Sequence, residues 1–221
     1  MGLTLHYHPL SSHCWKLLIA LDELGAPYTP QIVNLGDPAA RAAYAALWPT
    51  AKIPLLVDGE RVVPETAIQM EYLNRRMVGD LLPADFDAQL QVRLWNRLFD
   101  NYVMDPMQRY IAQMLRPATQ RDAKAQTDAV DLLGMAYDLI ERRMGEHSWA
   151  ASDAFSMADC TAAPSLFYAA TIRPFSADHS RLSAYFERLV ARPSVASAIE
   201  QAQPFFKYYP LQQAMPARFL G

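Results

Sequence analysis

The hydrophobic pattern at the start of the chain changes from that of a strand to that of a helix. Residues 3–7 alternate as in a short strand, and His8-Pro9 ends it, because proline cannot donate to a β-ladder. In residues 13–24 apolar side chains recur at helical spacing, and Gly25 follows at a position typical of a helix end. The pattern predicts a strand, a turn and a helix.

Four further segments follow the same logic within the first 80 residues. A second strand after the helix should pair in parallel with the first, through a right-handed crossover. Asp58-Gly59-Glu60 is typical of a tight hairpin turn between two short strands. The predicted segments are a strand at 28–33, an alanine-rich helix at 39–47, strands at 53–57 and 61–63, and an amphipathic helix at 66–77. Residues 1–80 should therefore form a small β-α-β-α-β-β-α domain.

After the connector "GDLLPADFD" the chain has helical periodicity and no convincing alternating strand. Residues 87–221 therefore predict a second, all-helical domain, so that the fold class is α/β plus all-α. Pro106 should end or kink one helix, and Pro117 suits the start of another.

The stretch "FSMADCTAAPSLF" carries a helix-start signature. Ser156 followed by Asp159 is a capping-box pattern, and Phe155 and Cys160 occupy the positions of a hydrophobic staple. We expect this helix to be buried and structural rather than catalytic.

Composition narrows the classes of partner. The 221 residues are 52% hydrophobic and 19% charged, which is typical of an ordered globular protein. Twenty basic and 23 acidic residues give a net charge of −3 with no basic cluster, which argues against nucleic acid. With no basic leader and no apolar run of roughly 20 residues, we expect a cytoplasmic protein without a membrane partner. Two cysteines and five histidines fit no standard metal motif, so no metal is predicted; His6 and His8, on one strand face, are the weak alternative.

Three features of the first domain point to one site. In "LSSHC", at the strand-to-helix junction, one serine can cap the helix while the other faces a cleft. Pro54 falls at the start of a central strand and exposes the backbone of Ile53 as an open edge. Glu65-Thr66 begins the next helix, whose N–H groups and dipole favour a carboxylate. The site would combine a helix start that binds anions, an open strand edge, and a hydroxyl or thiol.

These motifs, over nearly the whole chain, resemble those of the cytosolic glutathione transferases, with a thioredoxin-like N-terminal domain. "KIPLL" is similar to the family motif around a cis-proline, here Pro54, and implies that Ile53 pairs its backbone with the cysteinyl part of glutathione. "PETAIQMEYL" resembles the family's "ESxAIxxYL", so Glu65 and Thr66 are implied to hold the γ-glutamyl end; threonine replaces serine and keeps the hydroxyl. Lys52 is a candidate partner for the glycyl carboxylate, with a solvated surface lysine as the alternative.

The run "LSSHCWK" resembles the serine-type members of the family, zeta-like or theta-like. Ser11 is the implied thiolate-stabilising residue, and Ser12 is the next candidate, as cap or second donor. His13, Cys14 and Lys16 depart from the zeta run "SSCxWR". Tyr7, Cys14 and His13 remain alternatives, although Tyr7 is better explained by packing and Cys14 by burial.

The resemblance implies a homodimer that transfers glutathione to a hydrophobic electrophile. Asp100 could reach the γ-glutamyl amine of the partner, although a helix-surface aspartate is the default. The electrophile pocket should lie between the domains, and the aromatic tail at 205–209 could cover it. Candidate pocket residues are Tyr102, Met104, Met107, Tyr110, Met114 and Tyr168. The alternatives are a glutathione-dependent cis–trans isomerase acting on a maleyl-type acid, and a non-catalytic binding or stress-adaptor protein.

Overall fold

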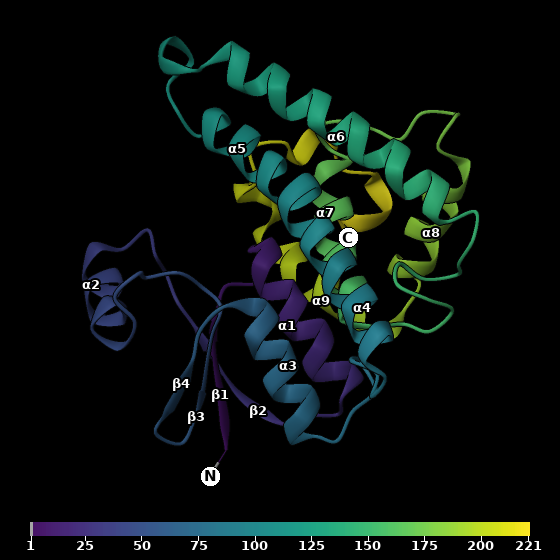
Figure 1. The fold of residues 1–221 in the computed structure, drawn as a ribbon. Helices are drawn as coiled ribbons and strands as arrows, with labels where there is room; N and C mark the ends of the chain where they lie inside the picture. Colours follow the sequence, from purple (N-terminus) through teal and green to yellow (C-terminus); the bar gives the residue numbers. More distant parts are fainter. Residues whose placement is uncertain (1) are drawn as a thin grey trace.

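The computed structural model describes residues 2–221 as a sheet-containing part and a helical part (Figure 1). The sheet has the strand order β2-β1-β3-β4, in which β1 pairs in parallel with β2 and antiparallel with β3. The elements are β1 (Leu3–Tyr7), α1 (Ser12–Glu23), β2 (Tyr28–Ile32), α2 (Pro38–Leu47), β3 (Leu55–Asp58), β4 (Arg61–Val63) and α3 (Thr66–Arg76). The predicted β-α-β-α-β-β-α order and the parallel pairing are confirmed, and this domain is thioredoxin-like.

Helix α1 joins the two parts of the molecule. It packs against α3 of its own domain and against α7 and α9 of the helical domain. Trp15, Leu17 and Ile19 are completely buried, because this helix is covered by the sheet on one side and by helices on the other. Figure 1 shows α1 and α3 between the sheet and the helical domain, with α2 set apart at the other side. Most of the buried side chains of α1 are apolar, as expected for a central helix.

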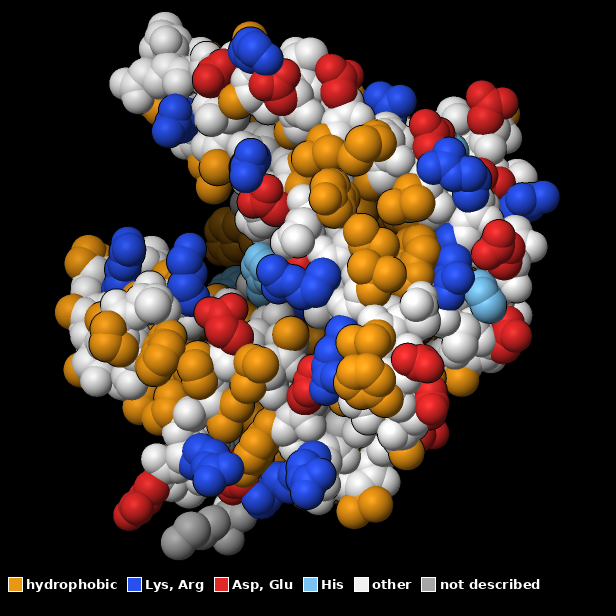
Figure 2. Space-filling view, in the orientation of Figure 1, with side chains coloured by type: hydrophobic (Ala, Val, Ile, Leu, Met, Phe, Trp, Pro, Cys, Tyr) orange, Lys and Arg blue, Asp and Glu red, His pale blue; other side chains and the backbone are white. Residues whose placement is uncertain are grey.

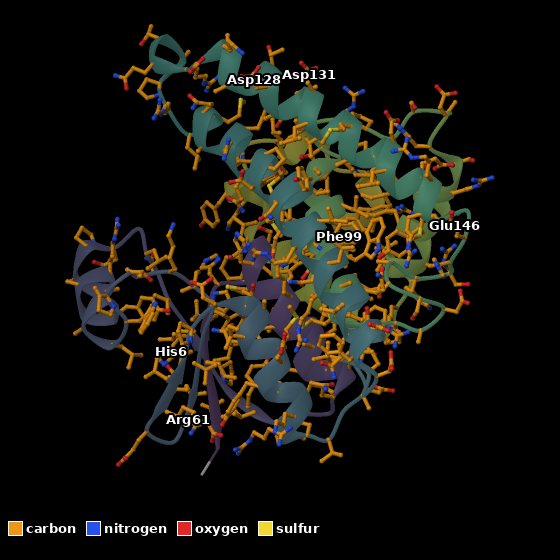
Figure 3. All side chains as sticks on the ribbon, viewed as in Figure 1. His6, Arg61, Phe99, Asp128, Asp131 and Glu146 are labelled. Atoms are coloured by element: carbon orange, nitrogen blue, oxygen red, sulfur yellow. The ribbon has the colours of Figure 1, made fainter. Side chains whose placement is uncertain are left out.

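The second domain is all helical, as predicted. Its main helices are α4 (Phe86–Phe99), α5 (Asp105–Met114), α6 (Ala123–Arg143), α7 (Met157–Ala169), α8 (Ser180–Val190) and α9 (Pro193–Ala202). Short 3-10 turns are η2 (Ala118–Gln120), η3 (Gln203–Tyr208), η4 (Gln212–Ala214) and η5 (Ala217–Phe219). Phe99, at the end of α4, is buried among these helices (Figure 3). The domain limits at residues 80 and 87 stay a prediction.

A π-helical turn, η1 (Asp100–Met104), separates α4 from α5. Pro106 follows two residues later, at the start of α5. Because proline has no N–H to donate within a helix, the backbone next to it readily adopts a wider turn. The predicted interruption at Pro106 is confirmed, and Asp100 opens the π-helical turn that precedes it.

Helix α7 is the centre of the helical domain, and every one of its side chains is buried. The capping box predicted at its start is present: the Ser156 side chain accepts from the first turn and Asp159 accepts from the Ser156 N–H at 2.9 Å. The Asp159 carboxylate also accepts from the Tyr185 hydroxyl at 2.6 Å and from the Ala150 N–H at 2.9 Å. These contacts support a structural role.

No helix in residues 2–221 is long and apolar enough to cross a membrane.

Candidate active site

The loop between β1 and α1 is a tight turn held from several directions. The Ser11 N–H donates to the His8 carbonyl at 3.0 Å and closes the turn. From α1, the Trp15 indole N–H donates to the Pro9 carbonyl at 2.6 Å, and from α7 the Tyr168 hydroxyl donates to the Leu10 carbonyl at 3.0 Å. Both domains therefore fix the position of the two serines.

The two serines differ in exposure and in partners. Ser11 is the N-cap of α1 and its Oγ accepts from the Cys14 N–H at 3.4 Å, which leaves its own hydroxyl hydrogen available to donate. Ser12 is almost completely buried, and its Oγ accepts from the Gln108 side-chain amide at 2.8 Å. Ser11 is half-buried and is the more accessible hydroxyl at the positive end of the helix.

The segment before β3 presents its backbone to a cleft. The Ile53–Pro54 peptide bond is cis, as the sequence motif implied, and β3 begins at Leu55 rather than at the predicted residue 53. The buried Gln69 side chain of α3 donates to the Pro54 carbonyl at 3.0 Å and to the Val63 carbonyl at 2.8 Å. Within residues 2–221, the N–H and carbonyl of Ile53 make no hydrogen bond, so this short edge can accept another extended backbone.

Glu65 stands at the N-cap of α3 with an unusual backbone. Its φ of 66° lies in the left-handed region, and its side chain makes no capping hydrogen bond. Such a conformation costs on the order of 1–3 kcal/mol in a residue other than glycine. The Glu65 carboxylate is exposed and does not cap the helix that it precedes. Thr66 is the first residue of that helix.

A polar cavity of about 490 Å³ brings these residues together. It contains all five predicted binding residues, Lys52, Ile53, Pro54, Glu65 and Thr66. The space-filling view shows the surface hollowed between the two parts of the molecule (Figure 2). Other charged or polar residues lining it are His13, Lys16, Arg97, Asp100, Asp105 and Gln108.

Lys16 and Asp100 form the floor of this cavity. Lys16 is completely buried and its Nζ donates to Asp100 Oδ1. Burial lowers the pKa of Lys16, while the Asp100 carboxylate opposes that shift. Burial, together with the charges of Lys16 and Lys52, lowers the pKa of His13 to about 4, against an opposing effect of Asp100. The His13 ring is therefore neutral at neutral pH.

The pairing of Asp100 differs from the sequence-based default of a solvated helix-surface residue. Its side chain is only 15% exposed, since it lies against Lys16 of α1. Sequence reasoning treated Lys16 only as a departure from a motif. One signal in the sequence could have revealed the buried pair. A lysine in an otherwise apolar helix is buried only with a partner, and a carboxylate is the usual one.

A second, apolar cavity of about 550 Å³ adjoins the first, and the two share Ile53 and Gln108. Of the predicted pocket residues, Met107 and Tyr168 line this cavity and Met104 lines the polar one. Tyr102, Tyr110 and Met114 line neither, because they fall on other sides of the helix that η1 and α5 form. The remaining walls are mainly Leu10, Ile111 and Leu115 and, from the tail, Tyr208, Tyr209 and Pro210.

Two earlier alternatives for the thiolate-stabilising residue, Tyr7 and Cys14, can now be placed. Tyr7 is buried, and burial raises the pKa of its hydroxyl. Cys14 is completely buried, and desolvation raises the pKa of its thiol to about 12 although Ser11 opposes this. Neither residue lines either cavity. Among residues 2–221, no group of three or more His, Cys, Asp or Glu side chains is arranged to hold a metal ion.

Comparisons with known proteins agree with this arrangement of domains. Residues 10–76 match the glutathione S-transferase N-terminal domain, and residues 103–193 match the glutathione S-transferase C-terminal domain. Over 207 residues the chain is 27% identical to glutathione S-transferase 3 of Zea mays, with 89% of this chain and 93% of that protein covered. It is 26% identical over 166 residues to a stringent starvation protein A homolog of Coxiella burnetii, with 75% of each chain covered.

A glutathione S-transferase from Methylobacillus flagellatus KT, solved with glutathione bound, has the same fold. The TM-score is 0.81 at 22% identity, over 89% of this chain and 98% of that one. The two domain matches together span most of the chain, and the observed fold agrees with them. The chain belongs to the glutathione S-transferase family.

Proposed function

We propose that this protein is a glutathione transferase that binds glutathione in the polar cavity and activates its thiol with Ser11. The observation that carries the proposal is the pair of adjoining cavities. One gathers Lys52, Glu65 and Thr66 around an unpaired backbone edge, and the other is apolar and contains Ser11. A charged tripeptide and an apolar electrophile would meet at their junction.

The polar cavity offers a complementary group for each part of glutathione. The Glu65 carboxylate suits the γ-glutamyl ammonium group, and the Thr66 hydroxyl with the N-terminus of α3 suits the neighbouring carboxylate. The backbone of Ile53 suits the cysteinyl amide, and Lys52 suits the glycyl carboxylate. Tyr44 supports this assignment, because its hydroxyl donates to the Lys52 carbonyl at 2.7 Å and fixes that segment.

Ser11 supplies the chemistry in this proposal. Only the thiolate of glutathione is a strong nucleophile, and a free thiol has a pKa near 8.5. Lowering that pKa by about two units requires roughly 2.7 kcal/mol of preference for the anion. A hydroxyl hydrogen bond to a charged group, at a helix N-terminus, is of that size.

The decisive experiment is titration of glutathione into wild type and Ser11→Ala while thiolate absorbance is followed against pH. We expect wild type to lower the thiol pKa and Ser11→Ala to bind glutathione without lowering it. Ser12→Ala is the matched control, since Ser12 is buried against Gln108. A shift that survives in Ser11→Ala and disappears in Ser12→Ala would contradict the assignment.

The apolar cavity favours transfer over isomerisation of a maleyl-type acid. Such a substrate carries two carboxylates and needs cations to hold it. No Lys, Arg, Asp or Glu of residues 2–221 lines this cavity, and Arg109 instead pairs with Asp105 at 2.9 Å on the helix surface. We therefore propose a serine-type transferase acting on a neutral electrophile.

The second candidate is a non-catalytic binding or adaptor protein. It is favoured by the similarity to the stringent starvation protein A homolog and by the contact of Ser11 Oγ with the Cys14 N–H, which is a cap whether or not glutathione binds. In this case wild type would not bind glutathione or would leave the thiol pKa unchanged in the titration above.

We also propose that two copies associate through α4. Phe86, Leu90 and Leu94 follow one another at intervals of four, and their side chains are 65%, 45% and 48% exposed. Hydrophobic side chains gather on this face of the molecule in Figure 2. Sedimentation should show a dimer that Leu90→Glu converts to monomer, while Leu115→Glu, at an exposed site on another segment, leaves it intact.

The cytoplasmic location stays a prediction.

A further inference from the structure

One polar side chain is buried on the inner face of α3. The buried residues of this helix are Gln69, Met70 and Leu73, and Gln69 is completely buried. An apolar side chain is the usual occupant of such a position, because burial of an amide costs free energy unless its groups are paired. Within residues 2–221, the Oε1 atom of Gln69 has no hydrogen-bond partner. Whatever this amide contributes therefore comes from its Nε2 group.

The Nε2 group of Gln69 binds two different segments. It donates to the Pro54 carbonyl at 3.0 Å and to the Val63 carbonyl at 2.8 Å. The backbone N–H of Gln69 also donates to the Glu65 carbonyl at 2.8 Å. Pro54 directly precedes β3, and Val63 is the last residue of β4. A single residue thus joins the segment before β3 to the segment before α3.

These two segments carry the residues proposed to hold glutathione. Residues 52–54 and residues 64–66 all line the polar cavity. Gln69 itself does not line that cavity. It can therefore act on a bound ligand only through the backbone groups that it holds, on one side beside Ile53 and on the other beside Glu65.

The β3–β4 hairpin alone does not fix the spacing of these segments. Its ladder ends where Leu56 pairs with Val63, so both Pro54 and Glu65 lie beyond the last pair. Glu65 also has a φ of 66°, and a residue other than glycine keeps such a conformation only where its surroundings hold it. Gln69 binds the carbonyl of Glu65 and the carbonyl two residues before it, so it supplies part of that support.

We propose that Gln69 is a positioning residue that sets the spacing between the two halves of the glutathione site. This inference rests on the proposed function and names a residue that controls glutathione binding without touching the ligand. Its contribution is to affinity, because segments that are already held in place do not have to be ordered when the tripeptide binds. Loss of the amide should therefore weaken the contacts at Ile53 and at Glu65 together.

The test replaces Gln69 by methionine, which is unbranched and of similar size but donates no hydrogen bond. Calorimetry gives the Kd of S-methylglutathione, which keeps the tripeptide but has no thiol to ionise. We expect Gln69→Met to raise this Kd about tenfold or more, since both segments must then be ordered on binding. Gln69→Asn keeps the amide on a shorter side chain and should give a smaller rise; it replaces Gln69→Met if that variant does not fold.

Thr161→Val is the matched control for loss of a buried hydrogen bond. Thr161 is completely buried in α7, and its hydroxyl donates to the side-chain oxygen of Asn96. It lines neither the polar nor the apolar cavity. Thr161→Val should lower the free energy of unfolding, as Gln69→Met does, but should leave the Kd unchanged. The comparison separates an effect on the site from an effect on stability.

A double-mutant cycle with Glu65→Gln tests how Gln69 acts. If the amide holds Glu65 in place, its loss already weakens the contact that Glu65 makes. The rise in Kd for Gln69→Met combined with Glu65→Gln should then fall short of the product of the two single rises by about threefold or more. Thr161→Val combined with Glu65→Gln should show no such shortfall.

The outcomes have different meanings. A raised Kd in Gln69→Met that is less than multiplicative with Glu65→Gln supports the proposal. Lower stability with an unchanged Kd overturns it, because the amide then serves the fold alone. A fully multiplicative effect also overturns it, because Gln69 then does not act through Glu65. Wild type that does not bind S-methylglutathione overturns the proposed glutathione site and the role of Gln69 with it.

Discussion

Lys16 of α1 donates a hydrogen bond to Asp100 of η1 across the boundary between the two domains. The lysine is completely buried, whereas the aspartate is 15% exposed at the floor of the polar cavity. Since an ammonium group without a partner is costly to bury, this contact ties the orientation of the domains to the shape of the cavity.

Asp100→Asn should destabilise the protein strongly, because it leaves the Lys16 ammonium group buried without a counter-charge. Loss of one partner of a buried pair costs about 3–5 kcal/mol. Urea unfolding gives the value, and Lys16→Met combined with Asp100→Asn should recover much of it. Asp128→Asn removes the exposed pair with Lys124 and should leave the stability nearly unchanged, because solvent screens that pair. Equal effects of the two single substitutions would refute the role of burial.

Glu65→Gln should weaken glutathione binding while leaving the fold intact. The side chain makes no capping contact, so the helix does not depend on its charge, but the proposed ammonium contact does. A hydrogen bond to a charged group contributes about 1.5–3 kcal/mol, which corresponds to a rise in Kd of roughly 10-fold to 150-fold. Calorimetry measures the Kd, and Glu60→Gln, on the exposed hairpin turn, is the control. An unchanged Kd in Glu65→Gln would remove Glu65 from the site.

His13 should make stability depend on pH. Its pKa is about 4 in the folded protein and 6.5 in the unfolded chain, so the unfolded chain binds more protons between these values. The contribution is complete above pH 6.5 and is lost as pH falls toward 4, to a limit of about 3 kcal/mol. Unfolding free energies of wild type and His13→Asn should therefore converge or cross as pH is lowered. Parallel curves would show that His13 titrates normally.

Asp159→Ala should be far more destabilising than Asp122→Ala, although both aspartates accept backbone N–H groups at helix starts. Asp159 is completely buried and has partners on three segments, so several buried donors lose their acceptor. We expect a loss of at least about 3 kcal/mol. Asp122 is exposed and accepts only the Ala125 N–H at 3.1 Å, which is worth about 1 kcal/mol. Thermal unfolding distinguishes the two.

The local elements could be predicted from sequence because their signals are local. The alternation in β1, the capping box before α7 and the interruption at Pro106 each depend on neighbouring residues. The five predicted glutathione-binding residues also came together, since Lys52 to Pro54 and Glu65-Thr66 flank one hairpin.

The remainder depends on contacts between distant segments. The partner of Lys16 is 84 residues away, on the π-helical turn η1, so no local pattern reveals it. Which side chains of the second domain reach the apolar cavity depends on the rotation of the helix, and a π-turn changes that rotation. Met107 therefore lines this cavity, whereas Tyr102 and Tyr110 do not.

The tail residues Tyr208, Tyr209 and Pro210 line the apolar cavity together with the loop after the first strand. During synthesis the ribosome releases that loop first and these residues only after α9. A nascent chain that has already exposed the serines and the edge at Ile53 still has no closed pocket for an electrophile. The order of synthesis thus makes the apolar cavity one of the last parts of the molecule to be completed.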